Sequence, residues 1–409
     1  MPASFLHGVE TIEIEKGART IKTVKTAVIG LVGTAPIEDV ESQFRTINEP
    51  TLILNEIDAV KYFGSNKNGF TIPQALQAIF DQGAGVVIVV NVYDPSKHES
   101  ISDVTKADII GGINATTGKR TGLKALEDSY SLFGYYPKTV IAPVYCEDNA
   151  VVTEINTLCK KIRGIGIVDA PVGTTVQEAI AGRGASGTIN FNTSSDRIIL
   201  CYPHLKVYDS KSDTTVLEPY SQRLAGVIAA KDIEKGYHWS PSNTEILGIV
   251  GVEKQLTSMI NDPSSEVNTL NEAGIVTVFN SYGSGIRTWG NRSAAYPSST
   301  YVTNFINIRR TADIIHESVE YSMLQFIDFP IDNGLIDAIT ESVNMFIRTL
   351  IGRGALIDGK CSFNPDKNPT TELANGHLLF DIEFMPPTPA ERITFESFID
   401  INLLKSLGV

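Results

Sequence analysis

A glycine-rich stretch in the middle of the 409-residue chain is the first candidate for chemistry. Gly182, Gly184 and Gly187 form a literal G-x-G-x-x-G pattern. In a dinucleotide site this pattern follows a strand and opens a helix, whose N-terminus then faces the pyrophosphate. Here the order is reversed, because a helical segment (VQEAIA) precedes the glycines and a strand-like segment (TINF) follows them. The sequence therefore does not favour a nucleotide site at this position.

A second glycine-containing loop, GINATTGKR at 112–120, is similar to a phosphate-binding loop but does not fit its spacing. Gly112 and Gly118 are one residue too far apart, and Arg120 follows Lys119 where a Ser or Thr would bind magnesium. We interpret this stretch as a polar loop in which Lys119 and Arg120 face solvent or a neighbouring chain.

The sequence supports neither a metal site nor a catalytic acid. His316 and Glu317 begin the sequence HESVE, in which Glu320 replaces the second histidine of the zinc motif H-E-x-x-H, so a charged cluster on a helix surface is expected. Asp169 ends a predicted strand, where an α/β enzyme can carry a catalytic acid, but Pro171 favours a turn that Asp169 caps. We predict no catalytic, cofactor-binding or metal-binding residue, and no cofactor.

Composition and charge exclude several classes of function. The chain has 34 Lys+Arg against 47 Asp+Glu, a formal net charge of −13, which argues against binding nucleic acid or an anionic membrane through a basic face. It contains no apolar run of the ~20 residues that span a bilayer, and its N-terminus does not resemble a secretory signal. The four widely spaced cysteines predict isolated buried thiols in a reducing compartment.

Most of the chain alternates between strand-like and helical segments. Helical spacing occurs at 72–82 and 154–162. Continuous apolar runs of strand length occur at 27–32, 85–92, 139–144, 166–169 and 197–201. Such runs between helices predict an α/β domain with a mostly parallel sheet and helices on both faces.

After residue 270 the pattern changes. Strands are predicted at 275–279 and 306–308, and long helices at 311–327 and 335–351. Segments 379–384 and 393–401 alternate as strands on either side of a stiff, proline-rich joint at 386–389, and a similar alternating segment (VETIEIE) lies at 9–15.

Several short stretches spread along the chain are shared with one protein family. They are His7-Gly8-Val9, Gly17-x-Arg19-x-Ile21, Thr26–Pro36, Ile110-Gly111-Gly112, Thr117–Leu123, Ala225–Ala229, Leu270-Asn271-x-Ala273-Gly274-Ile275, Gly285-x-Arg287-x-Trp289-Gly290-Asn291-Arg292 and Pro386-Pro387-x-Pro389-Ala390-Glu391. In this order, from His7 to Ile401, the chain resembles the contractile tail sheath proteins of bacteriophages. The departures are small: Lys231 and Ser293 stand where the family leads us to expect Arg and Thr.

The resemblance implies a structural protein without enzymatic activity. It implies a helical sheath of many copies around a tail tube, in contact with tube, baseplate and tail terminator proteins but not directly with nucleic acid or inserted into a membrane. Contraction of the sheath would drive the tube through the host envelope. The protein would be located in the virion tail, after assembly in the host bacterial cytoplasm.

The resemblance also implies a domain organisation. The outer α/β domain resembles subtilisin in fold without its triad, and an inner α+β C-terminal domain faces the tube. We expect an N-terminal arm at 1–22, the outer domain at 23–268 with a candidate inserted subdomain around 96–205, the inner domain at 269–388 and a C-terminal arm at 389–409.

The two terminal strands lack an obvious partner, and an isolated strand needs the edge of another sheet. Because the family is known for interlocked arms, our hypothesis is that both strands are donated to neighbouring subunits, with hinges at 17–25 and 385–391. In the alternative, both strands fold back onto their own domain. The apolar residues that would make these contacts are Val9, Ile12, Ile14, Ile393, Phe395 and Ile399.

Arg348 and Arg353, near the end of the helix at 335–351, are candidate contacts to the tube, because cations suit a helix C-terminus and would bind an acidic tube surface. The alternative is a core-packing helix with two solvated arginines. Since no nucleotide site is found, the energy of contraction would be stored in a metastable lattice at assembly. Two further identities stay open: the sheath of a headless tailocin or contractile injection device, and a nucleotide-binding α/β enzyme.

Overall fold

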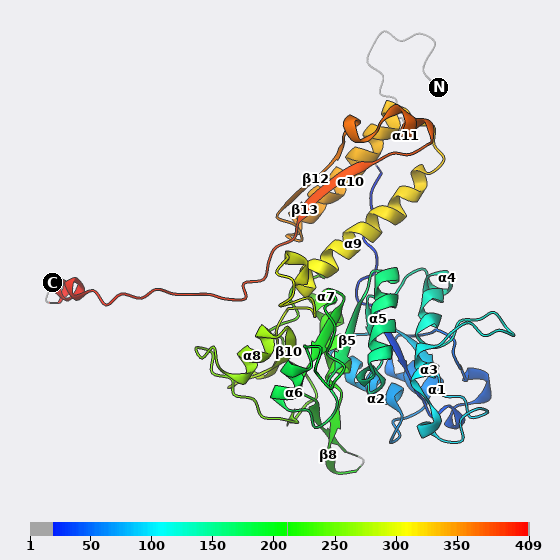
Figure 1. Cartoon of the computed structure of the whole chain (residues 1–409), viewed down its shortest axis with the longest axis vertical. Coiled ribbons are helices and arrows are strands. Elements are labelled where there is room, and N and C mark those ends of the chain that lie inside the picture. The colour runs from blue at the N-terminus through cyan, green and yellow to red at the C-terminus, as the bar shows by residue number, and fades with distance from the viewer. Residues whose placement is uncertain (1–18, 211, 408–409) are drawn as a thin grey trace, which may run out of the picture.

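A mixed eight-stranded sheet forms the centre of the larger part of the molecule (Figure 1). The computed structural model describes residues 19–210 and 212–407. Across the sheet the order is β11-β10-β6-β5-β4-β1-β3-β2; the six inner strands are parallel, and β2 and β11 are antiparallel at the edges. The strands are β1 Ile29–Gly33, β2 Thr51–Ile53, β3 Val87–Asn91, β4 Thr139–Ile141, β5 Ile165–Asp169, β6 Ile198–Cys201, β10 Ile275–Ser281 and β11 Gly285–Trp289.

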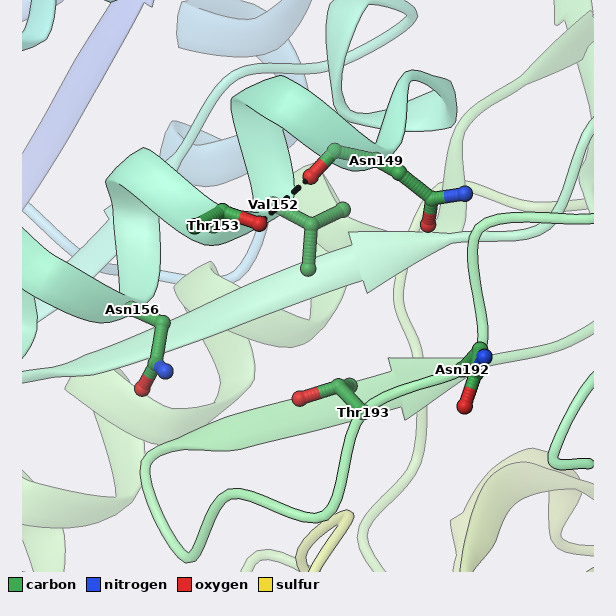
Figure 2. A pocket seen from close by; sticks show the side chains of 6 residues that line it. All are labelled: Asn149, Val152, Thr153, Asn156, Asn192 and Thr193. Carbon is green, nitrogen blue, oxygen red and sulfur yellow. Dashed lines mark hydrogen bonds between the residues drawn. The ribbon is translucent and has the colours of Figure 1, made fainter. Parts of the chain in front are cut away.

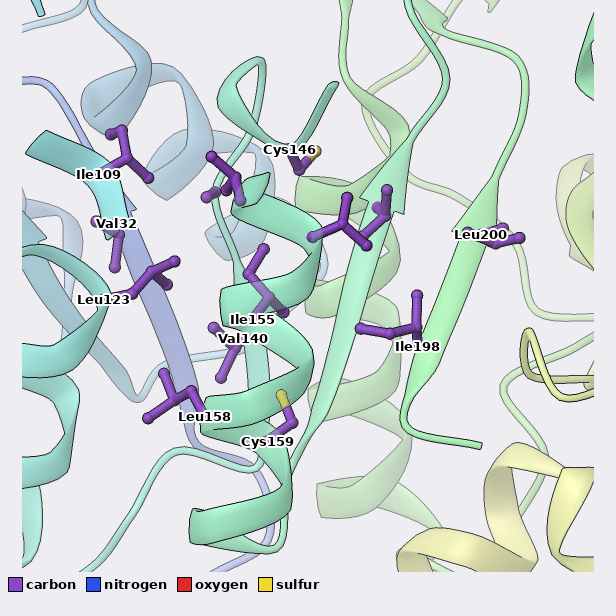
Figure 3. Packing of buried hydrophobic residues seen from close by; sticks show 14 of the residues in the cluster. Val32, Ile109, Leu123, Val140, Cys146, Ile155, Leu158, Cys159, Ile198 and Leu200 are labelled. Atoms are coloured by element: carbon purple, nitrogen blue, oxygen red, sulfur yellow. The ribbon is translucent and has the colours of Figure 1, made fainter. Parts of the chain in front are cut away.

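Helices cover both faces of this sheet, which confirms the predicted layers. Helices α3, α5, α6 and α8 contribute to the hydrophobic cluster on one face, and α1, α2 and α7 to the cluster on the other. Figure 3 shows Ile155 and Leu158 of α5 packing over Val140 and Ile198 of the sheet. The helices of this part are α1 Glu56–Phe63, α2 Thr71–Phe80, α3 Lys106–Ile110, α4 Ser129–Phe133, α5 Asn149–Ile162, α6 Val176–Ala181, α7 Tyr220–Glu234 and α8 Glu266–Glu272.

Strand β3 shows why the sheet needs two covering layers. Val87 and Val89 belong to one hydrophobic cluster, whereas Ile88 and Val90 belong to the other. Successive side chains of a strand point to opposite faces, so an uninterrupted apolar run makes both faces hydrophobic. The position of the core therefore follows directly from the sequence pattern.

A smaller, elongated part projects from one end of this body (Figure 1). Helices α9 and α10 and the antiparallel hairpin β12–β13 enclose their own core, to which Ile21 from the start of the described chain contributes. The elements are α9 Ile306–Met323, α10 Asn333–Gly352, β12 Asp358–Phe363, α11 Thr370–Ala374 and β13 Phe380–Met385. A separate three-stranded sheet, attached to the larger part, comprises β7 Leu205–Asp209, β8 Thr214–Glu218 and β9 Gly251–Val252.

Two of the predicted strands are wrong. Residues 306–308 form the first turn of α9, because three alternating residues cannot be distinguished from one turn of an amphipathic helix. The segment TINF at 188–191 is a turn and not a strand. The predicted helices 335–351 and 72–82 correspond to α10 and α2.

Two expected domain boundaries conflict with the sheet. Residues 96–205 supply β4, β5 and β6 at its centre, so they do not form an inserted subdomain. A boundary after residue 268 would cut the same sheet, because Ile275 and Val276 of β10 pair with Leu200 and Cys201 of β6. The chain passes from the larger part to the smaller part only where α9 begins.

Candidate assembly surfaces

The C-terminal segment is the most unusual surface feature of the chain. Residues 386–400 have no regular structure before a short 3₁₀ helix, Ile401–Ser406, and the end of the segment runs away from the body as an extended trace (Figure 1). The exposed fractions of its apolar residues are 70% for Ile393, 88% for Phe395, 84% for Phe398 and 92% for Ile399. The predicted strand thus finds no strand partner within the described part of the chain, and it does not fold back onto its own domain.

The N-terminal arm residues Val9, Ile12 and Ile14 lie outside the described residues. The segment that follows them is held between α9 and α10: the Arg19 amide donates to Ser342 Oγ (2.8 Å) and the Val24 amide donates to Ser318 Oγ (3.2 Å). The intervening Ile21 is 6% exposed and belongs to the core of the smaller part, formed by α9, α10 and β12–β13. The described part of the expected hinge at 17–25 is therefore fixed by burial and hydrogen bonds.

The hairpin β12–β13 offers one open edge. Its six residue pairs run from Asp358 opposite Met385 to Phe363 opposite Phe380. The side chain of Asn344 on α10 accepts from the amide of Cys361 (2.7 Å) and donates to its carbonyl (2.9 Å), which satisfies β12 at its outer edge. Within the described residues, β13 has no strand on its outer side.

Arg348 and Arg353, the expected tube contacts, lie near the end and at the C-cap of α10. Arg348 is paired with an acidic residue of the same helix, and Arg353 caps the helix. The guanidinium of Arg348 forms an ion pair with Glu341. Both side chains are more than half exposed, so water screens the pair. Arg353 caps the C-terminus of α10 and is exposed.

Three buried ion pairs connect α9 to the larger part of the molecule. They are Lys138–Glu317, Arg197–Asp313 and Arg310–Asp232. Burial lowers the pKa of Lys138 and raises the pKa of Glu317, while their mutual attraction opposes both shifts. Because a buried charge is costly without its partner, these pairs hold α9 in one orientation relative to the sheet.

The G-x-G-x-x-G stretch is a structural loop built around Arg183. A Cβ on Gly187 would lie 2.4 Å from the Cα of Gly182, so the glycines allow two backbone segments to touch. The guanidinium of Arg183 donates to five backbone carbonyls, those of Phe191, Thr193, Ala273, Ala294 and Tyr296. This arginine joins three loops, and burial lowers its pKa.

The other motifs are also occupied by structural contacts. In the loop 112–120, Lys119 forms an exposed ion pair with Glu49, and Arg120 pairs with Asp128. His316 packs edge-on against the Phe384 ring, and burial lowers its pKa. The expectation of a helix-surface cluster is wrong for Glu317, which is buried against Lys138.

The sequence suggests that Asp169 caps the turn at Pro171, but its side chain makes a different contact. Its carboxylate is 1% exposed and accepts the amide of Ser221 (2.7 Å) in the first turn of α7, and burial raises its pKa. Nearby Glu147, partly buried beside Asp169, has its pKa raised to about 7, first by desolvation and then by the negative charge of Asp169. The four cysteines, Cys146, Cys159, Cys201 and Cys361, are confirmed as buried and free.

A small polar pocket of about 150 Å³ lies between α5 and the loop at 192–193 (Figure 2). Thr153 Oγ1 donates to the carbonyl of Asn149 (2.9 Å) at its rim. No ionisable side chain lines it; the lining residues are Asn149, Val152, Thr153, Asn156, Asn192 and Thr193. The pocket therefore offers hydrogen bonds but no acid, base or nucleophile of suitable reactivity.

The described residues contain no group of three or more His, Cys, Asp or Glu side chains arranged to hold a metal ion. Across the same ranges, 19–210 and 212–407, no helix is long and apolar enough to cross a membrane. What distinguishes the surface is instead the exposed apolar tail, which follows β13 in the chain, and the open outer edge of β13 itself.

Comparison with known proteins decides the family. Residues 118–294 match the phage tail sheath protein central domain, and residues 298–400 match the phage tail sheath C-terminal domain. The chain is 46% identical to the tail sheath protein of Burkholderia phage BcepMu, over all of this chain and 99% of that protein. The chain belongs to the contractile phage tail sheath family. The tail sheath protein of Escherichia phage P2 is 30% identical, over 99% of this chain and 98% of its own length.

Solved sheath proteins share the fold at much lower identity. The sheath of the extracellular contractile injection system PVC, in its contracted state, has a TM-score of 0.69 at 16% identity and covers 98% of this chain and 100% of its own. The contracted helical sheath of the anti-feeding prophage has a TM-score of 0.70 at 17% identity, with 97% and 100% coverage. These structures show the shared fold; with the family shown by the phage relatives, the chain is a structural subunit of a contractile sheath, as its sequence predicts.

Sequence reasoning missed the ion pairs of α9 and the role of Arg183. Charged residues at 309, 310, 313, 317 and 320 recur at helical spacing, and this spacing alone predicts a solvated face. The partners of the three buried pairs lie 78 to 179 residues away in the sequence, whereas Arg309 pairs with Asp313 on the same helix. Arg183 lies inside the glycine motif. Its sequence neighbours do not indicate that its guanidinium binds five backbone carbonyls from other parts of the chain.

Proposed function

We propose that this sheath protein polymerises by strand exchange. The observation that carries the proposal is the segment 393–399, which has the alternation of a strand, four apolar side chains at least 70% exposed, and no partner in the described chain. Apolar surface of this kind gains about 25 cal/mol per Å² when it is buried. A neighbouring subunit supplies the burial, since the strand lies too far from its own body.

The outer edge of β13 is the recipient we infer for the C-terminal strand. Phe380, Ile382 and Phe384 of β13 pack toward the inner core, so an added strand would continue this apolar row with Ile393, Phe395 and Ile399. A two-stranded sheet is marginal by itself and gains from a third strand. About six backbone hydrogen bonds would form, each contributing about 0.5–1.5 kcal/mol net.

The N-terminal strand, with Val9, Ile12 and Ile14, is proposed to reach a neighbour in the same way. Its support is the fixed segment 19–24, which brings the chain to the surface beside α9 and α10. Both ends of the chain would then link the inner domains of adjacent subunits into one continuous network. Such links could persist while the outer domains slide.

The division into four parts is retained, without the inserted subdomain and with a later start of the inner domain. We propose arms at 1–22 and 389–409, an outer domain with a subtilisin-like sheet that lacks a catalytic triad, and an inner domain that begins with α9 near residue 306 instead of at residue 269. The inner domain faces the tube, with Arg348 and Arg353 as the proposed contacts. Reversing both charges should weaken binding to the tube, whereas unchanged co-assembly would contradict this assignment.

The remaining partners follow from this architecture. The sheath would contact the baseplate at one end and a terminator at the other, and would be assembled in the host cytoplasm as a metastable lattice without enzymatic activity or direct contact to nucleic acid. The sheath of a tailocin or an injection device would use the same subunit, since the difference lies in the neighbouring components. A nucleotide-binding enzyme is disfavoured because Arg183, inside the glycine motif, uses its guanidinium to hold five backbone carbonyls that lie outside the motif.

Electron microscopy of the purified full chain without ligand tests the proposal. The parent should form long hollow tubes, and Ile399→Asp should form none, because a charge would enter the buried face of the added strand. Thr394→Asp is the matched control, since residue 394 would lie on the opposite face and tubes should persist. Tubes formed equally by Ile399→Asp, or by a chain lacking residues 392–409, would contradict strand donation and leave the sheath function intact.

A further inference from the structure

The proline-rich joint before the C-terminal arm is held by the body, although the sequence suggests a hinge there. Asn307 Nδ2 on α9 donates to the carbonyl of Pro387 (3.3 Å). Pro386, Pro387 and Pro389 restrict the backbone between this contact and Glu391. The joint therefore runs along the body as a stiff segment up to residue 391.

At Glu391 the chain meets a preformed site around Arg292. The guanidinium of Arg292 lies 4.0 Å from the ring centroid of Phe305 and 4.5 Å from that of Tyr296. Its Nη1 donates to Asn304 Oδ1 (2.7 Å), which fixes the orientation of the planar group. Its other two nitrogens point to Glu391: Nε donates to Oε1 (3.0 Å), and Nη2 donates to Oε2.

This contact is stronger than an ordinary surface ion pair. The side chain of Arg292 is 18% exposed, and that of Glu391 is 46% exposed. A bidentate arginine–carboxylate pair combines two charge-assisted hydrogen bonds with a defined direction. The two aromatic rings add cation–π attraction and remove water from the arginine.

Beyond Glu391 the contacts end. Among the hydrogen bonds and ion pairs of residues 19–210 and 212–407, none joins residues 392–400 to the body. Figure 1 shows this part of the tail running away from the molecule. Glu391 is thus the last fixed point before the apolar strand begins.

We propose that Arg292 is a positioning residue for assembly, which fixes the point and the direction in which the C-terminal arm leaves the subunit before a neighbour is met. This inference rests on the proposed donation of the arm. An arm with a fixed root has less conformational freedom to lose on binding, so the anchor increases affinity without touching the neighbour. The pivot of the arm then lies after residue 391, and not within 385–391.

Distance measurements on the unassembled full chain test the anchor independently of assembly. Because all four native cysteines are buried, spin labels can be placed at Ser298→Cys on the body and Thr394→Cys on the arm. The parent should give a narrow distance distribution, and Arg292→Met or Glu391→Gln should at least double its width. Lys67→Met, which removes an exposed ion pair with Asp39 in the outer domain, is the control and should change nothing. Equal widths in all four proteins would overturn the proposal.

Polymerisation measurements test the consequence for assembly. Glu391→Gln should raise the critical concentration about five-fold with an unchanged melting temperature, since Glu391 lies outside the folded core. The double variant Arg292→Met/Glu391→Gln should be no worse than the more impaired single variant, because both remove the same contact. Additive effects, a parental critical concentration, or a parallel fall in melting temperature would each overturn the role of positioning residue.

Discussion

Strand β6 and the segment 393–399 are both rich in large apolar residues, but their environments are opposite. Both contain closely spaced isoleucine and other large apolar side chains, yet Ile199 in β6 is 1% exposed and Ile399 in the tail is 92% exposed. Strand β6 lies between β5 and β10 and is covered on both faces, whereas the described residues provide the tail with neither a neighbouring strand nor a covering helix. The comparison teaches that an apolar strand pattern specifies burial but does not specify which chain provides it.

Among substitutions in the buried part of the molecule, the largest loss of folding stability is expected at Arg183. Arg183→Met should lower the free energy of unfolding by about 4 kcal/mol, because five carbonyls lose their donor in a largely buried place. Denaturant unfolding measures the change. Arg392→Met in the tail is the control and should leave stability unchanged; equal stability of both variants would contradict the role of Arg183.

A matched pair of truncations compares the two strands directly. Ile199→Ala should cost about 3 kcal/mol of folding stability, because it opens a cavity in the sheet core. Phe395→Ala should leave the thermal midpoint of the unassembled chain unchanged and impair tube formation. A clear loss of stability in Phe395→Ala would show that the tail packs on its own subunit.

The sheet could be predicted from sequence, because its signals are local. The run Val87–Val90 is apolar at every position, and its residues alternate between the two hydrophobic clusters that the helices cover. The three residues 306–308 look like a strand in the sequence and are helical in the structure, because three residues are too few to reveal a helical period. Contacts such as Arg292–Glu391, 99 residues apart, leave no local trace because each residue alone suits a solvated loop.

The connection between the two parts can be weakened at Lys138. Lys138→Met should destabilise the fold by about 3 kcal/mol, since Glu317 keeps a buried charge without a partner. Adding Glu317→Leu should restore most of the loss, because the pair is replaced by apolar packing. Thermal unfolding of both variants checks this, and a double variant as unstable as the single one would argue against the ion pair.

The smallest predicted effect is a pH dependence at Glu147. Its pKa is raised to about 7 in the folded chain, so the folded state binds the proton more tightly than the unfolded state does. This contribution is complete near pH 4 and is lost as the pH rises to about 7. Glu147→Gln should therefore be about 1–2 kcal/mol more stable than the parent at pH 8 and equally stable at pH 4.5. Denaturation at the two pH values measures it; an equal gain at both would contradict the shift.

The anchored root of the tail also sets a limit on movement. Asp400 lies nine positions beyond Glu391 in the sequence, and at full extension this stretch spans at most ~30 Å. A neighbour that holds any part of this strand must stay within that radius of the donor's anchor in every state of the sheath. Contraction of the sheath would then come from rotation of subunits about these connecting strands. The length of the C-terminal arm would set the largest displacement between neighbouring subunits.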